Sequence, residues 1–408
     1  MATLPLSEAR HLPAWRRPTA LLLLMAFAMP IAFATWSALL NNFTIERAGF
    51  DGSDIGWLHT VREVPGFLAI GVIAVIVFVR EQTLALVSLI LLGVATALTA
   101  QVPSLGGLLL MTFLSSVGYH YYETVNQSLQ LQWLPKDRAP RMLGTLLSVG
   151  SGATLLAYGA LVVTWRAFDL SYDFVYWVAG AATAGIALAA WAIYPRFESP
   201  HPQTKAMVLR RRYWLYYALQ FMSGARRQIF IVFAGFMMVE RYALSVDEMT
   251  ALFMSTLVVN MVSAPLVGRA VGAFGERAAL IVEYAGLTAI FVLYAGLYAF
   301  DWGVWVAAAL FMANNVFFSL ALAIKTYFQK IATPSDIAPT AAVAFTINHI
   351  AAVFLPAALG YVWLTSPMAV FVLAAGMAAT SLGLSLLVPR HPVEGRETVL
   401  ANPLAVAE

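Results

Sequence analysis

The chain has 408 residues, of which 61% are hydrophobic and only 11% charged, whereas soluble domains average about 25% charged residues. A soluble fold of this length cannot bury so much apolar surface, so the composition excludes an ordinary soluble protein and predicts an integral membrane protein. The small net charge of +3 gives no reason to expect a nucleic-acid partner, and the absence of cysteine excludes disulfides, thiolate metal sites and a cysteine nucleophile.

Twelve apolar segments are long enough to cross a bilayer, which takes about 20 residues of helix. Residues 1–17 are polar and basic and lack a cleavage site, so we expect the first apolar segment to be a retained span and not a signal peptide. The predicted limits of the spans, in chain order, are 18–43, 54–79, 83–101, 104–134, 142–165, 174–194, 213–240, 248–268, 278–299, 303–328, 338–365 and 368–388.

The Lys and Arg residues predict the orientation of these spans. With a cytoplasmic N-terminus, seventeen of the 24 Lys and Arg residues fall in cytoplasmic segments and three in outer loops, as expected for cytoplasmic ends at both termini. We expect a multi-pass protein of the plasma membrane, or of the inner membrane in a bacterium. Its predicted parts are a cytoplasmic segment at 1–17, a six-helix bundle at 18–194, a cytoplasmic loop at 195–212, a second six-helix bundle at 213–388 and a cytoplasmic tail at 389–408.

An internal repeat relates the two halves of the chain. The pattern Pro-x-Asp-x-Ala-Pro occurs at Pro135–Pro140 and again at Pro334–Pro339, each time between the fourth and fifth spans of a half. Matching topological positions favour duplication over chance. Parallel six-span repeats build a known class of transporter in which the substrate site lies between the halves.

Six plus six spans, a basic central loop and a parallel repeat together resemble the major facilitator superfamily. The segment Gly268–Arg277 is similar to the family's cytoplasmic Gly-x-x-x-Asp-Arg-x-Gly-Arg-Arg loop, although Gly272 stands at the Asp position. The resemblance implies an all-α fold of twelve transmembrane helices in two pseudo-symmetric six-helix bundles. It also implies that the first, fourth, seventh and tenth spans line a central cavity, and that the third, sixth, ninth and twelfth face lipid.

Ionisable residues inside the spans agree with that arrangement, because such residues are costly in a membrane and mark functional positions. The third, sixth and twelfth spans have no charged residue in their interiors, and the ninth has only Glu283, near its cytoplasmic end. Polar residues gather instead in the second, fourth, seventh, eighth, tenth and eleventh spans. The substrate-binding candidates among them are Arg226, Arg227, Tyr121, Asn126, Asn314, Lys325 and His349.

His120 and Glu123 are one helical turn apart in the fourth span and share a helix face. One interpretation is a proton relay or substrate contact, since histidine titrates near neutrality. Structural hydrogen bonding is the second interpretation. A metal site is the third, but two ligands are too few, and only His349 or His59 is available to join them; we therefore predict no metal and no cofactor.

Arg62 and Glu63 are candidates for a gate in the second span. Adjacent residues on a helix point about 100° apart, so we expect that they are not each other's main partners. An interhelix ion pair and a substrate contact are both open interpretations. Pro65 and Gly66 follow at once and are expected to loosen the helix there.

Arg226 and Arg227 are the best-supported candidates for substrate binding, because we expect them near the middle of the membrane in the seventh span. Guanidinium groups at that depth need carboxylates, an anionic substrate or a wet cavity, and Glu63 and Glu123 are the only acids that we expect at such depth. Lys325 lies nearer the cytoplasm and either extends to the interface or faces the cavity; the repeat offset pairs it with Asn126.

Positive charge exceeds negative charge among these deep residues, which favours an anion as the solute. We therefore predict a secondary active transporter, not an enzyme, which moves a small organic anion by alternating access, is coupled to protons, and works in the bilayer as a monomer. The alternatives are a proton-driven exporter of drugs or amphipathic compounds and, less favoured, a divalent-metal exporter. No GxxxxGK[ST] phosphate loop supports an ATP-driven pump.

Overall fold

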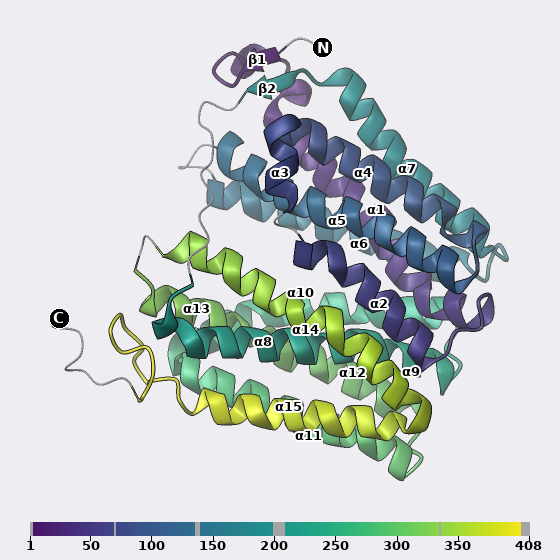
Figure 1. The fold of residues 1–408 in the computed structure, drawn as a ribbon. Helices are drawn as coiled ribbons and strands as arrows, with labels where there is room; N and C mark the ends of the chain where they lie inside the picture. Colours follow the sequence, from purple (N-terminus) through teal and green to yellow (C-terminus); the bar gives the residue numbers. More distant parts are fainter. Residues whose placement is uncertain (1–2, 69–70, 135–138, 199–208, 334–335, 401–408) are drawn as a thin grey trace. The chain divides into compact units, whose positions relative to one another are not determined.

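A computed structural model describes residues 3–68, 71–134, 139–198, 209–333 and 336–400. Contacts divide the chain into two compact units (Figure 1). Unit 1 comprises residues 1–50, 61–204 and 244–254, and unit 2 comprises residues 51–60, 205–243 and 255–408. The predicted limits of the two bundles stay a prediction.

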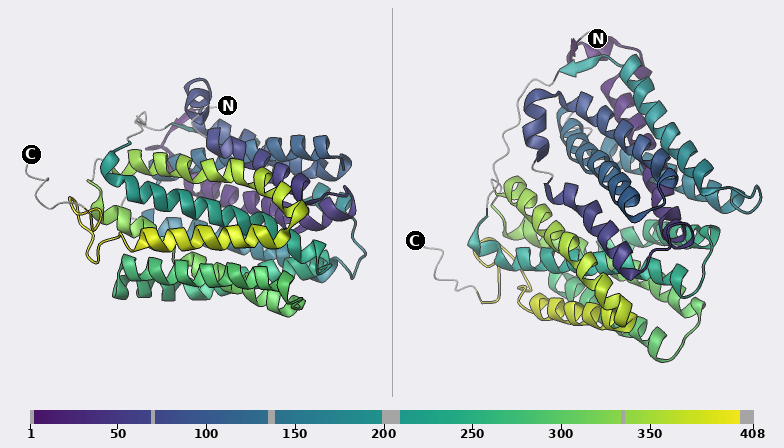
Figure 2. Two further views of the ribbon diagram at one scale, coloured as in Figure 1. Left: turned by 60° about the horizontal axis from the view of Figure 1, so that its bottom comes forward. Right: turned by 45° about the vertical axis from the view of Figure 1, so that its right-hand side comes forward.

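Unit 1 is built from long helices. They are α1 (Pro18–Glu46), the end of α2 (Gly52–Phe67), α3 (Gly71–Phe78), α4 (Glu81–Leu98), α5 (Leu105–Trp133), α6 (Ala139–Thr164) and α7 (Tyr172–Ile193). In the three views, α4 lies against α5 and α7, and α1 packs on α6 and α7 (Figures 1 and 2). Two short strands, β1 (Thr3–Pro5) and β2 (Arg196–Glu198), pair in parallel, with Leu4 opposite Phe197.

Unit 2 contains α8 (Trp214–Ile229), a π-helical segment (Phe230–Ala234), α9 (Gly235–Glu240), most of α10 (Val246–Phe274), α11 (Glu276–Ala299), α12 (Val304–Ser319), α13 (Leu322–Ile331), α14 (Ile337–Thr365) and α15 (Pro367–Ser385). Here α8 packs on α14 and α15, and α11 packs on α12 and α15. Single 3₁₀ turns at Ala9–His11, Ala14–Arg16, Thr99–Gln101 and Arg211–Tyr213 complete the helical elements.

Nine helices of the described residues are long and apolar enough to cross a membrane. The three remaining predicted spans correspond to less regular or more polar segments. The span at 54–79 is divided between α2 and α3, the span at 104–134 is the polar helix α5, and the span at 213–240 is divided by the π-helical segment. The tenth span is also divided, since tight turns at Leu320 and Ala321 separate α12 from α13.

The two sequence motifs lie at helix ends. Helix α10 continues to Phe274, past its predicted limit at residue 268, and Gly275 then adopts a φ of +81° before α11 begins. The buried Glu276 carboxylate forms an ion pair with Lys330, with 2.7 Å between Glu276 Oε1 and Lys330 Nζ. Of the repeat, residues 135–138 and 334–335 lie outside the described residues. Asp336 is buried before α14, where its carboxylate accepts hydrogen bonds from Arg210 Nη2 (2.8 Å) and the Tyr213 hydroxyl (3.0 Å).

Candidate functional site

Helix α8 carries Arg226 and Arg227 on its last turn, directly before the π-helical segment. A short π-helical stretch within a helix is rare and often marks a functional position. Gly224, two residues earlier, packs against the backbone of Asn348 on α14, where a β-carbon would collide with the Asn348 carbonyl. This close approach holds α8 against α14 beside the two arginines.

Arg226 is buried, with 1% of its side chain exposed, and its charge partner is Glu283 on α11, which is 0% exposed. The Arg226 Nη2 and Glu283 Oε1 atoms are 3.6 Å apart, and the guanidinium lies 4.4 Å from the centre of the Tyr284 ring. The expectation that only Glu63 and Glu123 are deep acids is therefore wrong. Glu283 lies two turns inside α11, because this helix begins at Glu276.

The Arg226–Glu283 pair has few hydrogen bonds. Arg226 Nε donates to the Met222 carbonyl at 3.1 Å. Five polar atoms of this group have no hydrogen-bond partner among the described residues. They are both Nη atoms of Arg226, both carboxylate oxygens of Glu283 and the hydroxyl of Tyr284. A buried charge normally needs both a counter-ion and hydrogen bonds, so this pair retains unused capacity to bind a polar group.

Arg227 is half-buried and braced from α14. Its Nη2 atom donates to Asn348 Oδ1 at 2.9 Å, and Asn348 Nδ2 in turn donates to the Gln220 carbonyl at 3.1 Å. Asn348 therefore orients the guanidinium of Arg227 through a neutral hydrogen bond.

Both arginines line one pocket in unit 2, which holds about 470 Å³ of empty space, its open side included. Asn314 on α12 is 2% exposed, and Asn315 Nδ2 donates to the Phe311 carbonyl at 2.9 Å. The remaining walls are apolar, so the pocket combines two cations and two amides with aromatic surface. Its lining residues are Arg226, Arg227, Phe230, Ile231, Leu287, Phe291, Asn314, Asn315 and Phe318.

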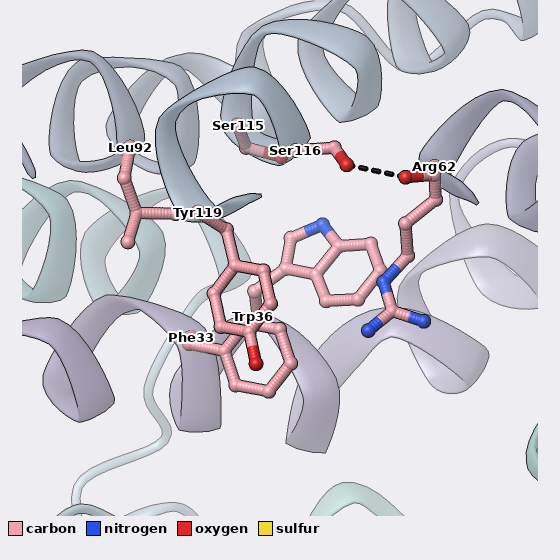
Figure 3. A pocket seen from close by; sticks show the side chains of 7 residues that line it. All are labelled: Phe33, Trp36, Arg62, Leu92, Ser115, Ser116 and Tyr119. Atoms are coloured by element: carbon pink, nitrogen blue, oxygen red, sulfur yellow. Dashed lines mark hydrogen bonds between the residues drawn. The ribbon is translucent and has the colours of Figure 1, made fainter. Parts of the chain in front are cut away.

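A second, smaller pocket lies in unit 1 around Arg62, as Figure 3 shows. The Arg62 guanidinium lies 5.6 Å from the Phe33 ring and 5.5 Å from the Trp36 ring, and Ser116 donates a hydrogen bond to the Arg62 carbonyl. Tyr119 stacks on Phe33 at 4.5 Å. The other lining residues are Leu92 and Ser115.

Arg62 Nη1 also contacts Glu63 Oε1 at 3.0 Å. The two neighbours therefore form an ion pair, and the expectation that neither is the other's main partner stays a prediction. Although the two Cα–Cβ bonds point apart, the long arginine side chain folds back to the adjacent carboxylate. The gating role of the pair stays a prediction.

The other predicted site residues of unit 1 lie on α5. His120 and Asn126 are buried, Tyr121 and Glu123 are half-buried, and the Asn126 Oδ1 atom has no hydrogen-bond partner among the described residues. The Thr124 hydroxyl donates to the His120 carbonyl, so this part of α5 keeps its helical course. The proton-coupling role of His120 and Glu123 stays a prediction.

In unit 2 the structure brings Arg226, Arg227 and Asn314 into one pocket. Lys325 is exposed on α13 and His349 is buried on α14; neither belongs to the lining. Glu283 was missed as a site residue. The sequence does contain a signal for Glu283, since it is the only charged residue in the predicted span 278–299. A single acid in such a span needs a buried cation as its partner.

Comparison with known proteins gives one family. The model described as Major Facilitator Superfamily matches residues 19–356. No curated protein matches the chain in sequence.

Solved structures are similar to the chain in fold. A mutant of the nucleoside transporter NupG superposes with a TM-score of 0.76 at 12% identity, covering 90% of this chain and 99% of that one. A bacterial homologue of the human lysosomal transporter Spinster, inward-facing and occupied, gives a TM-score of 0.68 at 13% identity, covering 91% and 96%. An auto-inhibited peptide transporter of the POT family gives 0.67 at 11% identity, covering 90% and 95%.

Proposed function

The chain belongs to the major facilitator superfamily, and on that premise we propose that this multi-pass secondary transporter carries a small organic anion together with protons. The alternating-access mechanism follows from the family. The anionic solute, the coupling ion, a plasma-membrane location with cytoplasmic termini and a monomeric state are parts of the proposal.

The observation that carries the proposal is the pair of arginines in one pocket of unit 2. A buried guanidinium whose Nη atoms lack hydrogen bonds favours a carboxylate, because the planar fork of donors matches two carboxylate oxygens. The phenylalanine walls favour an apolar body attached to that group. An anion of this kind accepts hydrogen bonds from Arg226 and lies close to Arg227 in the same pocket.

Protons are proposed as the coupling ion because His120 and Glu123 lie within one turn of each other on α5, which corresponds to the predicted fourth span. Binding a proton at Glu123 and losing it on the other side of the membrane would link solute movement to the pH gradient. The solved relatives named for nucleosides and peptides share the fold at 11–13% identity, which does not carry their solutes over to this chain.

The first experiment is a thermal-stability screen of the purified protein with carboxylates of increasing apolar size, from acetate to benzoate, each beside its neutral amide. We expect the carboxylates to raise the melting temperature and the amides to leave it unchanged, since binding to the native state stabilises it. Equal stabilisation by acid and amide would remove the case for an anion.

Transport is then measured in proteoliposomes with the best-stabilising carboxylate. An inward proton gradient should drive accumulation in wild type, while Glu123→Gln should exchange solute across the membrane without accumulating it. Gradient-driven accumulation that survives in Glu123→Gln contradicts the coupling role of that residue. Gln127→Ala, at an exposed position of the same helix that is not a site candidate, serves as the control for a changed polar side chain.

A further inference from the structure

The carboxylate of Glu283 occupies the place that a substrate anion would take on Arg226. The two side chains are 0% and 1% exposed, and their closest N–O distance of 3.6 Å is longer than a hydrogen bond between charged groups. Transferring two charges from water costs several kcal/mol per ion and is offset only by close geometry with additional hydrogen bonds. The 3.6 Å separation and the single additional hydrogen bond, from Arg226 Nε to the Met222 carbonyl, offset only part of this cost, so an anion that makes closer hydrogen bonds with Arg226 can compete with Glu283.

Arg226 is the only described residue that both lines the pocket and forms this ion pair, because Glu283 itself lies behind it and outside the lining. Arg226 therefore belongs to the lining of the pocket and also contacts Glu283 and Tyr284. An anion entering the pocket competes with Glu283 for the same donors.

Few other groups can compensate Glu283. Helices α12 and α15, which pack against α11, contain no ionisable side chain, and α8 contributes Arg226. On α11 itself Tyr284 is the adjacent titratable group. Helix α13 contributes Lys325, which is exposed, Lys330, which pairs with Glu276, and Tyr327, which donates to the Glu397 carbonyl.

We propose that Glu283 is an internal counter-ion that the transported anion displaces from Arg226, and that Glu283 binds one proton when it loses this partner. The inference rests on the proposed function and adds the coupling at the binding site itself. In the balanced step, Arg226 exchanges the Glu283 carboxylate for the substrate carboxylate, and a proton from water joins Glu283 to give a neutral acid. No covalent bond to carbon changes, and the net charge of the site stays constant for a monovalent anion.

The test is calorimetry of benzoate, or of the best-stabilising carboxylate of the screen, in buffers of different ionisation enthalpy, which counts the protons bound with the ligand. Wild type should take up about one proton per carboxylate, and its affinity should fall about tenfold per pH unit where Glu283 is charged before binding. Glu283→Gln should still bind, with an uptake near zero and an affinity that does not change with pH. Glu276→Gln on the same helix, whose carboxylate pairs with Lys330 and lies outside the pocket lining, is the matched control and should keep the proton uptake of wild type.

Two outcomes overturn the proposal: benzoate binding to wild type without proton uptake, or proton uptake that persists in Glu283→Gln. A ligand-free measurement separates this failure from that of the proposed function. In Arg226→Gln, infrared spectroscopy should show a protonated carboxyl group at neutral pH, which the double variant Arg226→Gln/Glu283→Gln lacks. If no carboxylate binds, this band alone decides the role of Glu283, and its absence from Arg226→Gln contradicts it.

Discussion

Each unit contains one deep arginine paired with a glutamate, but the two pairs are built differently. In unit 1, Arg62 contacts its sequence neighbour Glu63 at 3.0 Å, lies beside two aromatic rings, and keeps 16% of its side chain exposed. In unit 2, Arg226 faces Glu283 from another helix at 3.6 Å, and both side chains are fully buried. The same residue types therefore give one hydrogen-bonded pair and one pair whose hydrogen bonds are missing.

This difference indicates which pair is suited to exchange partners. In the Arg62 pair the carboxylate is within hydrogen-bonding distance of the guanidinium, and two aromatic rings attract the cation. In the Arg226 pair the cation borders a pocket, and among the described residues neither of its Nη atoms has a hydrogen bond. A structural or gating role fits the first pair, and a binding role fits the second.

The largest expected effect comes from Arg226→Leu. Removing the cation leaves Glu283 without a counter-ion in a buried place, which costs about 3–5 kcal/mol while the carboxylate stays charged. We expect a lower melting temperature, with a larger loss at pH 8 than at pH 6, and no benzoate uptake into proteoliposomes.

The double variant Arg226→Leu/Glu283→Leu is the control for this cost. It removes both charges, so stability should return while uptake stays lost. Recovery of uptake in the double variant would show that the anion does not bind Arg226. Arg227→Leu should lower stability less, because the partner that it leaves behind, Asn348, is neutral.

A smaller effect is expected from Gly224→Ala on α8. The new methyl group collides with the backbone of Asn348, the residue that braces Arg227, and overpacking of this kind costs about 1–3 kcal/mol. Melting temperature and benzoate affinity should both fall. Gly272→Ala in α10 is the matched control, since a β-carbon there has no neighbouring atom within 4 Å. Alanine has a higher helix propensity than glycine, so Gly272→Ala should not lower the melting temperature. Similar losses in both variants would contradict the contact with α14 as their cause.

Glu63→Gln should cost less again, about 1 kcal/mol, because the amide oxygen still accepts from Arg62 and the aromatic rings retain the cation. Benzoate affinity and the number of protons bound should match wild type. These values are measured by thermal unfolding and calorimetry. A change in proton uptake would mean that the unit 1 pair is exchangeable too, and the contrast between the pairs would be lost.

The sequence predicts the spans well, because the thickness of the bilayer sets the length and hydropathy that a spanning helix needs, and both are local properties of the chain. The breaks within spans are less accessible. Pro65 and Gly66 signal the irregular second span, whereas Phe230–Ala234 is an ordinary apolar run that gives no sign of its π-helical geometry.

The site was predicted in part for a related reason. Because Arg226 lies near the middle of its predicted span, the sequence alone predicts that its side chain is buried, as the structure shows. Its pairing with Glu283 joins residues 57 positions apart and depends on how α8 packs in unit 2, which no local pattern encodes. The contact between Arg62 and Glu63 was not predicted, for a different reason. Helix geometry gives the directions of the Cα–Cβ bonds, but it does not describe how far a flexible arginine side chain can reach.

The smallest expected effect concerns a third charged cluster, at Asp336, which lies outside the spans. Hydrogen bonding from Arg210 above all lowers the pKa of Asp336, and Tyr213 adds to this. A carboxyl whose pKa is lowered by folding stabilises the protein above its ordinary pKa of about 3.9, and the contribution is lost only as the pH falls below that value. Asp336→Asn should therefore lower the melting temperature by the same amount at pH 6 and at pH 8.

Melting curves of wild type and Asp336→Asn at both pH values measure this difference, with Glu276→Gln, which removes the charge partner of Lys330, as a second control. A loss that changes between pH 6 and pH 8 would contradict a carboxylate that is fully charged throughout. The expected constancy separates hydrogen-bonded charges from the Arg226–Glu283 pair, for which we expect pH dependence over the same interval. A buried carboxylate that loses its counter-ion has reason to bind a proton near neutral pH, because burial disfavours its charged form.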